Sequence, residues 1–302
     1  MNAPCWRAGR FEIDLARPRV MAIVNVTPDS FSDGEPELTP AAAIARCERL
    51  LADGADILDI GGESSRPGAN SIAADVELTR VRPVLEAAVR LGCPVSIDTT
   101  KAKVMRAALD LGVDIVNDLS ALREPGALEV VAAHGRCGVC LMHMRGTSAS
   151  MRGEARYDDV VGEVRAFLRE RIAALEAAGI GRERIVADPG IGFAKTADHN
   201  VELLARQGEL LALGVPLLVG WSRKSTIARL AGVATPPARR TADERMRIEA
   251  ASVAAAVLAV ERGARIVRVH DVAATVAGLA VWNAARGADN RRDFPTASDP
   301  RP

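Results

Sequence analysis

The sequence has no excess of either charge, no long apolar run and few cysteines, and these absences remove several classes of protein. Its 302 residues include 39 Lys and Arg and 39 Asp and Glu, so the formal net charge is zero. Such a chain lacks the basic surface of a nucleic-acid-binding protein and has no bias toward charged membranes. The longest apolar runs have the length of a strand, which is too short to span a membrane. The N-terminal stretch MNAPCWRAGRFEID lacks the apolar core of a signal peptide.

The cysteines and histidines give no sign of a disulfide framework or a zinc site. Five cysteines, an odd number at irregular spacing, indicate reduced thiols and a cytoplasmic protein. Cys137 and Cys140 form a CxxC, but residues three apart on a strand point to opposite faces, which favours buried thiols over a redox or zinc site. The four histidines lack zinc spacing. We interpret His134 and His199 as surface or helix residues.

Apolar strand-like runs alternate with helical segments along nearly the whole chain. Such runs, joined by helical crossovers, indicate a parallel sheet covered on both faces. Several helical segments stop at a glycine just before the next strand, which is typical of a helix C-terminal cap. The eight runs are VMAIVNV (20–26), DILDIGG (56–62), PVSID (94–98), DIVND (114–118), GVCLMH (138–143), RIVAD (184–188), PLLVG (216–220) and RIVRVH (265–270).

Eight strand–helix units predict an α/β protein with a single-domain (β/α)8 TIM-barrel fold. We expect the barrel over residues 20–287, an N-terminal extension packing on it over 1–19, and a flexible C-terminal tail over 288–302. A doubly wound open sheet is the alternative on pattern alone. No GxGxxG or GxxxxGKS/T follows the first run, which disfavours dinucleotide and P-loop sites.

Almost every predicted strand ends in side chains that could do chemistry. In a barrel these ends meet at one mouth, where active sites are built. A single Asp, Asn or Ser there could simply cap the next helix, but capping does not explain a lysine, arginines and histidines at the same ends. The strand-end residues are Asn25, Glu63, Ser64, Ser65, Arg66, Asp98, Asn117, Asp118, His143, Asp188, Ser222, Arg223, Lys224, Ser225, Arg268 and His270.

The strand-end residues fall into two chemical kinds. Asp98, Asn117 and Asp188 can bind a flat heterocycle rich in N–H groups, and Lys224 adds a donor for a ring carbonyl or nitrogen. WSRKST also opens a helix, whose free N–H groups favour a carboxylate or phosphate. The mouth is therefore predicted to hold a polar ring, a phosphate-like group and a second small anion. The further donors for an anion are Asn25, Arg66, Arg268 and His270.

Eight motifs in a fixed order resemble those of the dihydropteroate synthase family. They run from Asn25 to Val272 and are NVTPDSFSDG, DIGGESSRPGA, SIDTTK, NDLSA, LMHMRG, DPGIGFAKT, GWSRKS and RVHDV. The resemblance implies a transferase that joins 6-hydroxymethyl-7,8-dihydropterin diphosphate and p-aminobenzoate, releasing pyrophosphate and forming 7,8-dihydropteroate for folate synthesis. It also implies small-molecule substrates, Mg2+ as cofactor, a homodimer and a sulfonamide target.

The resemblance also implies a role for each matched residue. The pterin would be held by Asp98, Asn117, Asp188 and Lys224, and the diphosphate by Asn25, Arg66, Arg268 and His270. Mg2+ would bridge the diphosphate near Asn25. The p-aminobenzoate would be held by Ser65, Pro67, Phe193 and Ser225, with Ser225 at its carboxylate. Phe31 and Asp33 fall where the family's first mobile loop closes over the reacting carbon.

The predicted chemistry is a displacement with a carbocation-like transition state. Diphosphate leaves from a CH2 group attached to a conjugated dihydropterin, so the site must neutralise the departing anion with Mg2+, Arg268 and His270. Asp33 is the candidate negative charge near the developing cation. The arylamine is already neutral at pH 7, which explains why no paired nucleophile and base is required.

Three departures from the family pattern leave alternatives open. Ser65 stands where Thr is more common, and Trp221 occupies a slot usually filled by a smaller residue, for which we favour packing. Glu35 and Pro36 replace an expected Gly and a longer polar insert after Asp33, which could alter loop closure. One alternative is a catalytically silent pterin-binding paralogue. The other is a pterin-dependent methyltransferase, which would not need the anion donors on the last strand.

Overall fold

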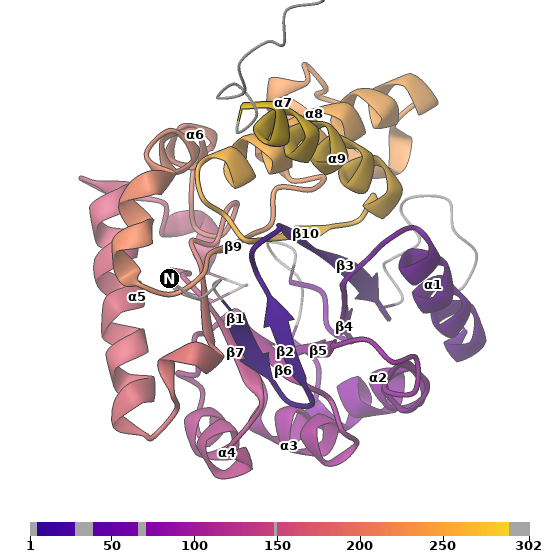
Figure 1. The fold of residues 1–302 in the computed structure, drawn as a ribbon, viewed down its shortest axis with the longest axis vertical. Helices are drawn as coiled ribbons and strands as arrows, with labels where there is room; N and C mark the ends of the chain where they lie inside the picture. Colours follow the sequence, from indigo (N-terminus) through magenta and orange to yellow (C-terminus); the bar gives the residue numbers. More distant parts are fainter. Residues whose placement is uncertain (1–4, 28–38, 66–70, 148–149, 290–302) are drawn as a thin grey trace, which may run out of the picture.

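Eight parallel strands form a nearly closed barrel, which confirms the predicted fold class (Figure 1). The computed structural model describes residues 5–27, 39–65, 71–147 and 150–289. The barrel strands are β3 (Arg19–Asn25), β4 (Ile57–Gly61), β5 (Val95–Asp98), β6 (Ile115–Asp118), β7 (Gly138–Met142), β8 (Ile185–Asp188), β9 (Leu218–Val219) and β10 (Ile266–Val269). Their spatial order is β8-β7-β6-β5-β4-β3-β10-β9, and a parallel bridge between Ala187 and Leu217 joins the two edge strands.

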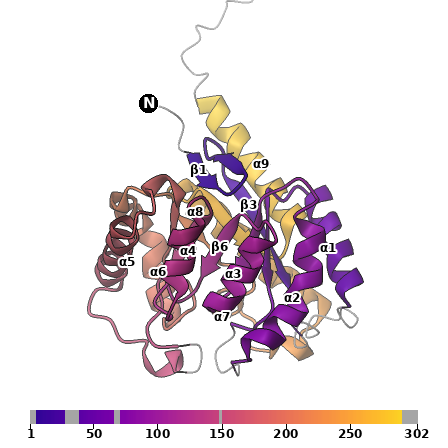
Figure 2. The same cartoon turned by 90° about the horizontal axis from the view of Figure 1, so that it is seen from below.

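Helices surround the barrel, as Figure 1 and Figure 2 show. They are α1 (Pro40–Ala52), α2 (Ala74–Ala88), α3 (Ala102–Asp110), α4 (Ala127–His134), α5 (Val160–Ala177), α6 (Ala197–Ala205), α7 (Ser225–Leu230), α8 (Ala242–Glu261) and α9 (Val272–Asp289). Threonine side chains cap the starts of α1, α6 and α8, accepting hydrogen bonds from N–H groups of the first turn. The expected glycines follow six of the helical segments with positive φ: Gly54, Gly92, Gly112, Gly179, Gly214 and Gly263.

Alternate side chains of each strand face the helices or the barrel interior. In β3, Val20 and Val24 pack under the helices, whereas Met21 belongs to an inner cluster. Cys137 lies in the outer cluster and Cys140 in the inner one, so the two residues of the CxxC occupy opposite sides of the sheet, as predicted. All five cysteines are free. The inner cluster fills the amino ends of the strands with Met21, Ile57, Ile115, Cys140, Val186, Leu218 and Ile266.

A hairpin of β1 (Cys5–Ala8) and β2 (Phe11–Asp14) closes the amino end of the barrel. Trp6 is fully buried against the inner cluster, and its indole N–H donates to the carbonyl of Arg184 at 2.9 Å. At the turn, the Arg10 guanidinium contacts both carboxylate oxygens of buried Asp114, at 2.9 and 2.8 Å. Figure 2 shows β1 at one end of the barrel and α7 at the other. The sequence indicated an extension here but not its hairpin form.

Several predicted features lie outside the described residues. These are Phe31, Asp33, Glu35 and Pro36, then Arg66 and Pro67, and the tail from residue 290 onward. Within the part of the chain that the structure describes, no helix combines the length and apolarity needed to cross a membrane. His134 ends α4 and His199 lies in α6, which confirms their interpretation as helix residues.

Candidate active site

The carboxyl ends of the barrel strands bring most of the predicted site residues to one mouth. Asp98 ends β5 and is paired in register with Asn117 of β6, while Asn25 ends β3 opposite Gly61. Asp188 ends β8, and Arg268 lies on β10. Because side chains alternate along a strand, residues that share a register layer face the same side. Strand pairing alone therefore places carboxylates, amides and a guanidinium around one opening.

An arginine shared by two carboxylates lies at the centre of the mouth. Arg268 donates from Nε to Asp59 Oδ2 and from Nη2 to Asp98 Oδ2, each at 2.6 Å. Asn117 donates from Nδ2 to the same Asp59 oxygen at 3.1 Å. Asp59 is fully buried. It was missed from the sequence, although a carboxylate inside the apolar run ILDIG requires a buried partner and so carried a signal.

The charges of this cluster are set by burial and by mutual contact. Burial raises the pKa of Asp98 to about 7, partly offset by the Arg268 guanidinium. Burial opposes the charge of Arg268, but Asp59 and Asp98 hold its pKa above the ordinary value. The guanidinium therefore stays charged, while Asp98 can exist with or without its proton near neutral pH. Such a carboxylate can accept hydrogen bonds from an N–H-rich ring placed above it.

Lys224 and Asp188 form a second charged group beside the first. Burial lowers the pKa of Lys224 to about 8, and Asp188 opposes this shift. The Lys224 ammonium donates to the carbonyl of Ile191 and lies 4.6 Å from the centroid of the Phe193 ring. Burial raises the pKa of Asp188, whose Oδ1 accepts from the N–H of Gly190 at 2.7 Å. The aromatic ring, the cation and the carboxylate thus line one wall of the mouth.

His270 and Ser225 lie at the other side, near the end of β10 and the start of α7. The Oγ of Ser222 is 3.0 Å from Nδ1 of His270 and accepts from the His270 N–H at 3.2 Å. The next residues are also joined, because Arg223 Nε donates to Asp271 Oδ2 at 3.1 Å. Ser225 is exposed at the first position of α7.

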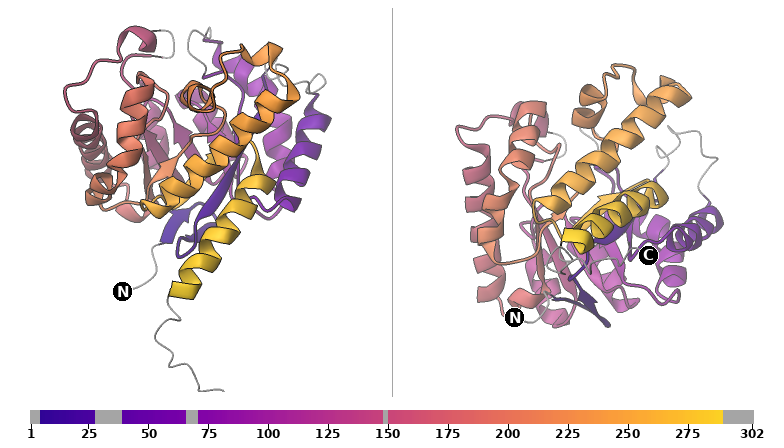
Figure 3. Two further views of the ribbon diagram at one scale, coloured as in Figure 1. Left: turned by 90° about the horizontal axis from the view of Figure 1, so that it is seen from above. Right: turned by 45° about the horizontal axis from the view of Figure 1, so that its top comes forward.

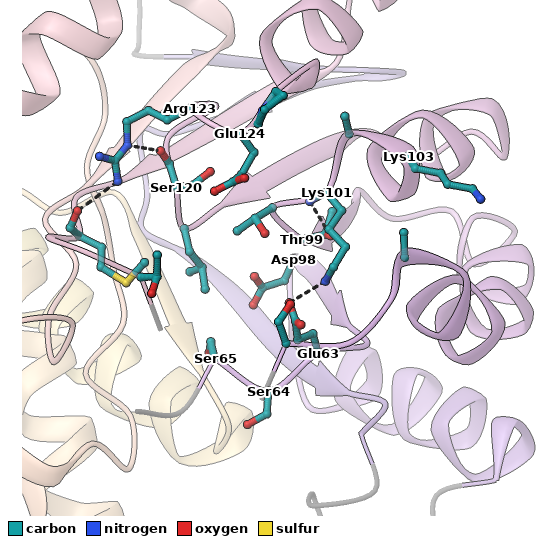
Figure 4. Close-up of a pocket in the computed structure, with 18 of the residues that line it drawn as sticks. Glu63, Ser64, Ser65, Asp98, Thr99, Lys101, Lys103, Ser120, Arg123 and Glu124 are labelled. Carbon is teal, nitrogen blue, oxygen red and sulfur yellow. Dashed lines mark hydrogen bonds and ion pairs between the residues drawn. The ribbon is translucent and has the colours of Figure 1, made fainter. Parts of the chain in front are cut away.

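A cavity of about 760 Å³ opens above Asp98 (Figure 4). Its walls come from the segments after β4, β5, β6 and β7, and include Ser65, Lys101 and Arg123. Figure 4 shows the Lys101 side chain reaching toward Glu63, whose Oε2 it contacts at 2.8 Å. Asp98 and Ser65 line this cavity, whereas Asn117, Asp188 and Lys224 do not, so the cavity lies beside the buried polar cluster and meets it at Asp98.

A shared lysine ties the cavity wall to α2. Lys101 Nζ also donates to Oε2 of fully buried Glu77 at 2.7 Å. The other carboxylate oxygen of Glu63 accepts a hydrogen bond from the backbone N–H of Ile72 at 2.8 Å. The Glu63 side chain therefore links the residues after β4 to those just before α2. Burial opposes ionisation, but the hydrogen bonds from Lys101 and Ile72 hold the pKa of Glu63 below its ordinary value.

Two strand-end residues serve the fold rather than the opening. Asp118 accepts from the N–H groups of Ser120 and Leu122, both at 2.7 Å, and so caps its own turn. His143 Nδ1 lies 2.9 Å from Nζ of Lys195, and burial lowers the pKa of His143 to about 2. Lys195 also donates to the Gly190 carbonyl at 3.0 Å. Lys195 was not singled out from the sequence.

Asn25 is the residue at the described mouth that the sequence assigned to a metal ion. Across residues 5–27, 39–65, 71–147 and 150–289, no group of three or more His, Cys, Asp or Glu side chains is arranged to hold a metal ion. Asn25 offers an amide oxygen at the mouth. Mg2+ commonly binds through one or two protein oxygens together with substrate phosphates and water, so the donor set is compatible with Mg2+ carried on a phosphate.

Comparison with known proteins gives one consistent result. Residues 21–270 match the family described as pterin binding enzyme. Dihydropteroate synthase of Neisseria meningitidis serogroup B is 50% identical over 284 residues, covering 92% of this chain and 96% of that protein.

Solved structures agree with the sequence comparison. A Xanthomonas albilineans dihydropteroate synthase structure with 4-aminobenzoic acid is 48% identical, covers 97% of this chain and 100% of that one, and has a TM-score of 0.86. A second structure of that enzyme, in complex with 7,8-dihydropteroate, is 47% identical at the same coverage with a TM-score of 0.82. The Yersinia pestis dihydropteroate synthase with a sulfonamide drug is 42% identical, covers 94% and 99% of the two chains, and has a TM-score of 0.86.

Proposed function

The chain belongs to the pterin-binding enzyme family and, within it, to the dihydropteroate synthases, and on that premise we propose that it joins 6-hydroxymethyl-7,8-dihydropterin diphosphate to p-aminobenzoate. The products are 7,8-dihydropteroate and pyrophosphate. The observation that carries the proposal is the group of buried carboxylates and an amide at the mouth, set beside Arg268 and Lys224. These groups match an N–H-rich ring joined to an anionic leaving group.

The pterin is proposed to lie on the buried polar groups. Asp98 and Asp188 accept hydrogen bonds from the ring N–H groups, and the Asn117 amide offers a further polar contact. Lys224, with its pKa lowered to about 8 by burial, remains mainly protonated at pH 7 and donates to a ring carbonyl or nitrogen. Ring binding would release Lys224 from its contact with the Ile191 carbonyl.

The diphosphate is proposed to meet the donors on β10 and the neighbouring strand ends. Arg268 and His270 donate to its oxygens as charge builds on the leaving group, and Asn25 and Arg66 complete the set. Asn25 would hold Mg2+ through its amide oxygen. When bound, the ion supplies positive charge that stabilises the leaving diphosphate.

The amine is proposed to enter above the pterin. Phe193 packs against its ring and Ser225 binds its carboxylate, while Ser65 and Pro67 are assigned from the sequence to the same substrate. Phe31 and Asp33 are assigned from the sequence to a loop that covers the reacting carbon, with Asp33 stabilising positive charge there. Because the arylamine is neutral, its lone pair attacks without a dedicated base. Sulfonamides are proposed to compete for the same position.

We further propose a cytoplasmic homodimer. The absence of disulfides among five free cysteines supports a reducing compartment. The homodimer is proposed from the resemblance to the dihydropteroate synthase family. Sedimentation equilibrium of the purified protein tests this, and a single species at 31.9 kDa would contradict it.

A pyrophosphate-release assay tests the proposed reaction. With both substrates and Mg2+, we expect steady release that stops when p-aminobenzoate is omitted or when EDTA is added. The Asp98→Asn variant removes one carboxylate from the pterin contacts and should abolish pyrophosphate release. Pterin binding in calorimetry without release would indicate the silent paralogue. Methyl transfer from methyltetrahydrofolate without release would indicate the methyltransferase.

A further inference from the structure

Ser222 contacts His270 twice through one oxygen atom. Its Oγ accepts a hydrogen bond from the His270 backbone N–H at 3.2 Å and lies 3.0 Å from Nδ1 of the same residue. Ser222 follows β9 and is only 6% exposed, whereas His270 follows β10 and is half-buried. The pair therefore joins the ends of two neighbouring strands at the edge of the mouth.

The geometry limits where the imidazole proton can reside. A hydroxyl has one hydrogen to donate and two lone pairs to accept with, and the backbone N–H occupies one lone pair. Among the described residues, Nδ1 is the one acceptor recorded within hydrogen-bond distance of the Ser222 hydroxyl. With the hydroxyl hydrogen directed at Nδ1, the proton of the neutral ring lies on Nε2. If the ring becomes an imidazolium, Nδ1–H donates to the second lone pair, and Nε2 still carries a proton.

We propose that Ser222 is a positioning residue that fixes His270 as a hydrogen-bond donor through Nε2–H. This inference rests on the proposed function, in which His270 faces the departing diphosphate. An imidazole protonated on Nδ1 instead would direct the Nε2 lone pair at an anion and repel it. Ser222 thus supports leaving-group departure without touching the substrate.

The residue after Ser222 is also held by hydrogen bonds. The backbone N–H of Arg223 donates to Ser252 Oγ on α8 at 3.1 Å, and Arg223 Nε binds Asp271 Oδ2 at 3.1 Å. Arg223 also adopts φ of +58°, which is uncommon for a residue with a side chain. Consecutive residues after β9 therefore contact consecutive residues after β10, which joins the two strand ends at two successive positions.

Nitrogen-15 NMR of the imidazole rings tests the inference without any substrate. The chain has only four histidines, and His270→Gln assigns the relevant signals. At a pH where the His270 signals no longer titrate, we expect the wild-type protein to show a protonated Nε2 and an unprotonated Nδ1. In Ser222→Ala the two signals should move toward each other as the other tautomer becomes populated. Ser222→Thr, which keeps the hydroxyl, should retain the wild-type pattern.

Ser96→Ala is the matched control because it removes a hydroxyl that is buried and has no hydrogen-bond partner in the described structure. It should leave the His270 signals unchanged. A wild-type ring protonated on Nδ1, or identical signals in the wild type and Ser222→Ala, would overturn the inference.

Kinetics provide a second measurement. Ser222→Ala is expected to lower kcat by about tenfold while the KM for p-aminobenzoate stays within about twofold, and Ser222→Thr should restore most of the rate. An unchanged kcat, or a loss confined to KM for the amine, would contradict the assignment. If the wild-type protein releases no pyrophosphate, the proposed reaction fails, and the NMR result still decides the role of Ser222.

Discussion

Replacing Lys101 with methionine removes the cation shared by two carboxylates beneath the cavity wall. Lys101 Nζ contacts Glu63 at 2.8 Å and Glu77 at 2.7 Å, and the Glu77 side chain is fully buried. Methionine fills a similar volume but leaves the Glu77 carboxylate without its cation. Removing one partner of a buried ion pair costs about 3–5 kcal/mol, and we expect the lower end because about a fifth of the Lys101 side chain is exposed.

This loss converts into a measurable shift of the melting temperature. Unfolding entropy of about 2.1 cal/mol/K per residue gives roughly 0.6 kcal/mol/K for a chain of 302 residues. A loss of about 3 kcal/mol therefore lowers Tm by about 5 °C, measurable by differential scanning calorimetry at pH 7. Adding Glu77→Gln to Lys101→Met should recover part of the shift, because it removes the buried negative charge.

Lys103→Met is the matched control two residues away. Lys103 pairs with Asp75 at 2.6 Å, but the two side chains are 61% and 76% exposed, so Tm should move by less than about 1 °C. The difference in Tm between the Lys101→Met variant and the wild type should also shrink below pH 4.5, the ordinary pKa of Glu63. Below that pH the carboxylate, whose pKa is lowered in the folded protein, becomes protonated and loses its attraction to Lys101. Equal Tm shifts for the two lysine variants would refute the reasoning.

Three further predictions concern the mouth. Burial raises the pKa of Asp98 to about 7, so the pterin affinity measured by calorimetry should fall by up to about tenfold per pH unit below pH 7. Asp98→Asn should flatten this pH dependence. A flat profile for the wild type would contradict the role of the Asp98 carboxylate in pterin binding. Gly190→Ala should lower the free energy of unfolding by at least about 3 kcal/mol in chemical denaturation, because the new Cβ would lie 1.9 Å from the His143 carbonyl oxygen. Gly92→Ala, at a residue with φ of +75° but open space around it, should lower it by about 1–2 kcal/mol. Asp33→Asn should leave pterin affinity within about twofold but lower kcat more than about tenfold; an equal loss of both would make its loop a binding element.

The barrel itself was accessible from the sequence because local patterns determine it. Each apolar run sits within one or two residues of the corresponding strand, as with 20–26 against Arg19–Asn25. The glycines after the helices adopt the expected positive φ. Strand alternation also supported packing for Trp221, which is 2% exposed within the outer cluster. Periodicity and turn residues act over a few positions, so they can be read from a single sequence.

The pairings within the mouth could not be predicted in this way. Asp59 contacts Arg268 across 209 positions of sequence, and no local pattern reports such a contact. The neighbours Asn117 and Asp118 also differ in ways that only the contacts show: the Asn117 amide binds Asp59 in the barrel interior, whereas Asp118 caps its own turn. The sequence placed Asp98, Asp188 and Arg268 at or near the carboxyl ends of their strands, where the structure has them, whereas the division between site and scaffold required the contacts.

The hairpin covers the amino end of the barrel, whose interior is already filled by the inner cluster, so the barrel is open to ligands only at its carboxyl end. Trp6 and its neighbours seal that end, and Figure 3 (left) shows the indigo hairpin at the lower end of the barrel, beside the N-terminus. Both substrates must therefore use one entrance. Asn117 is 3% exposed, whereas Ser225 at the rim is exposed. A ligand on Asn117 would therefore lie below one at Ser225, and we expect the deeper ligand to bind first.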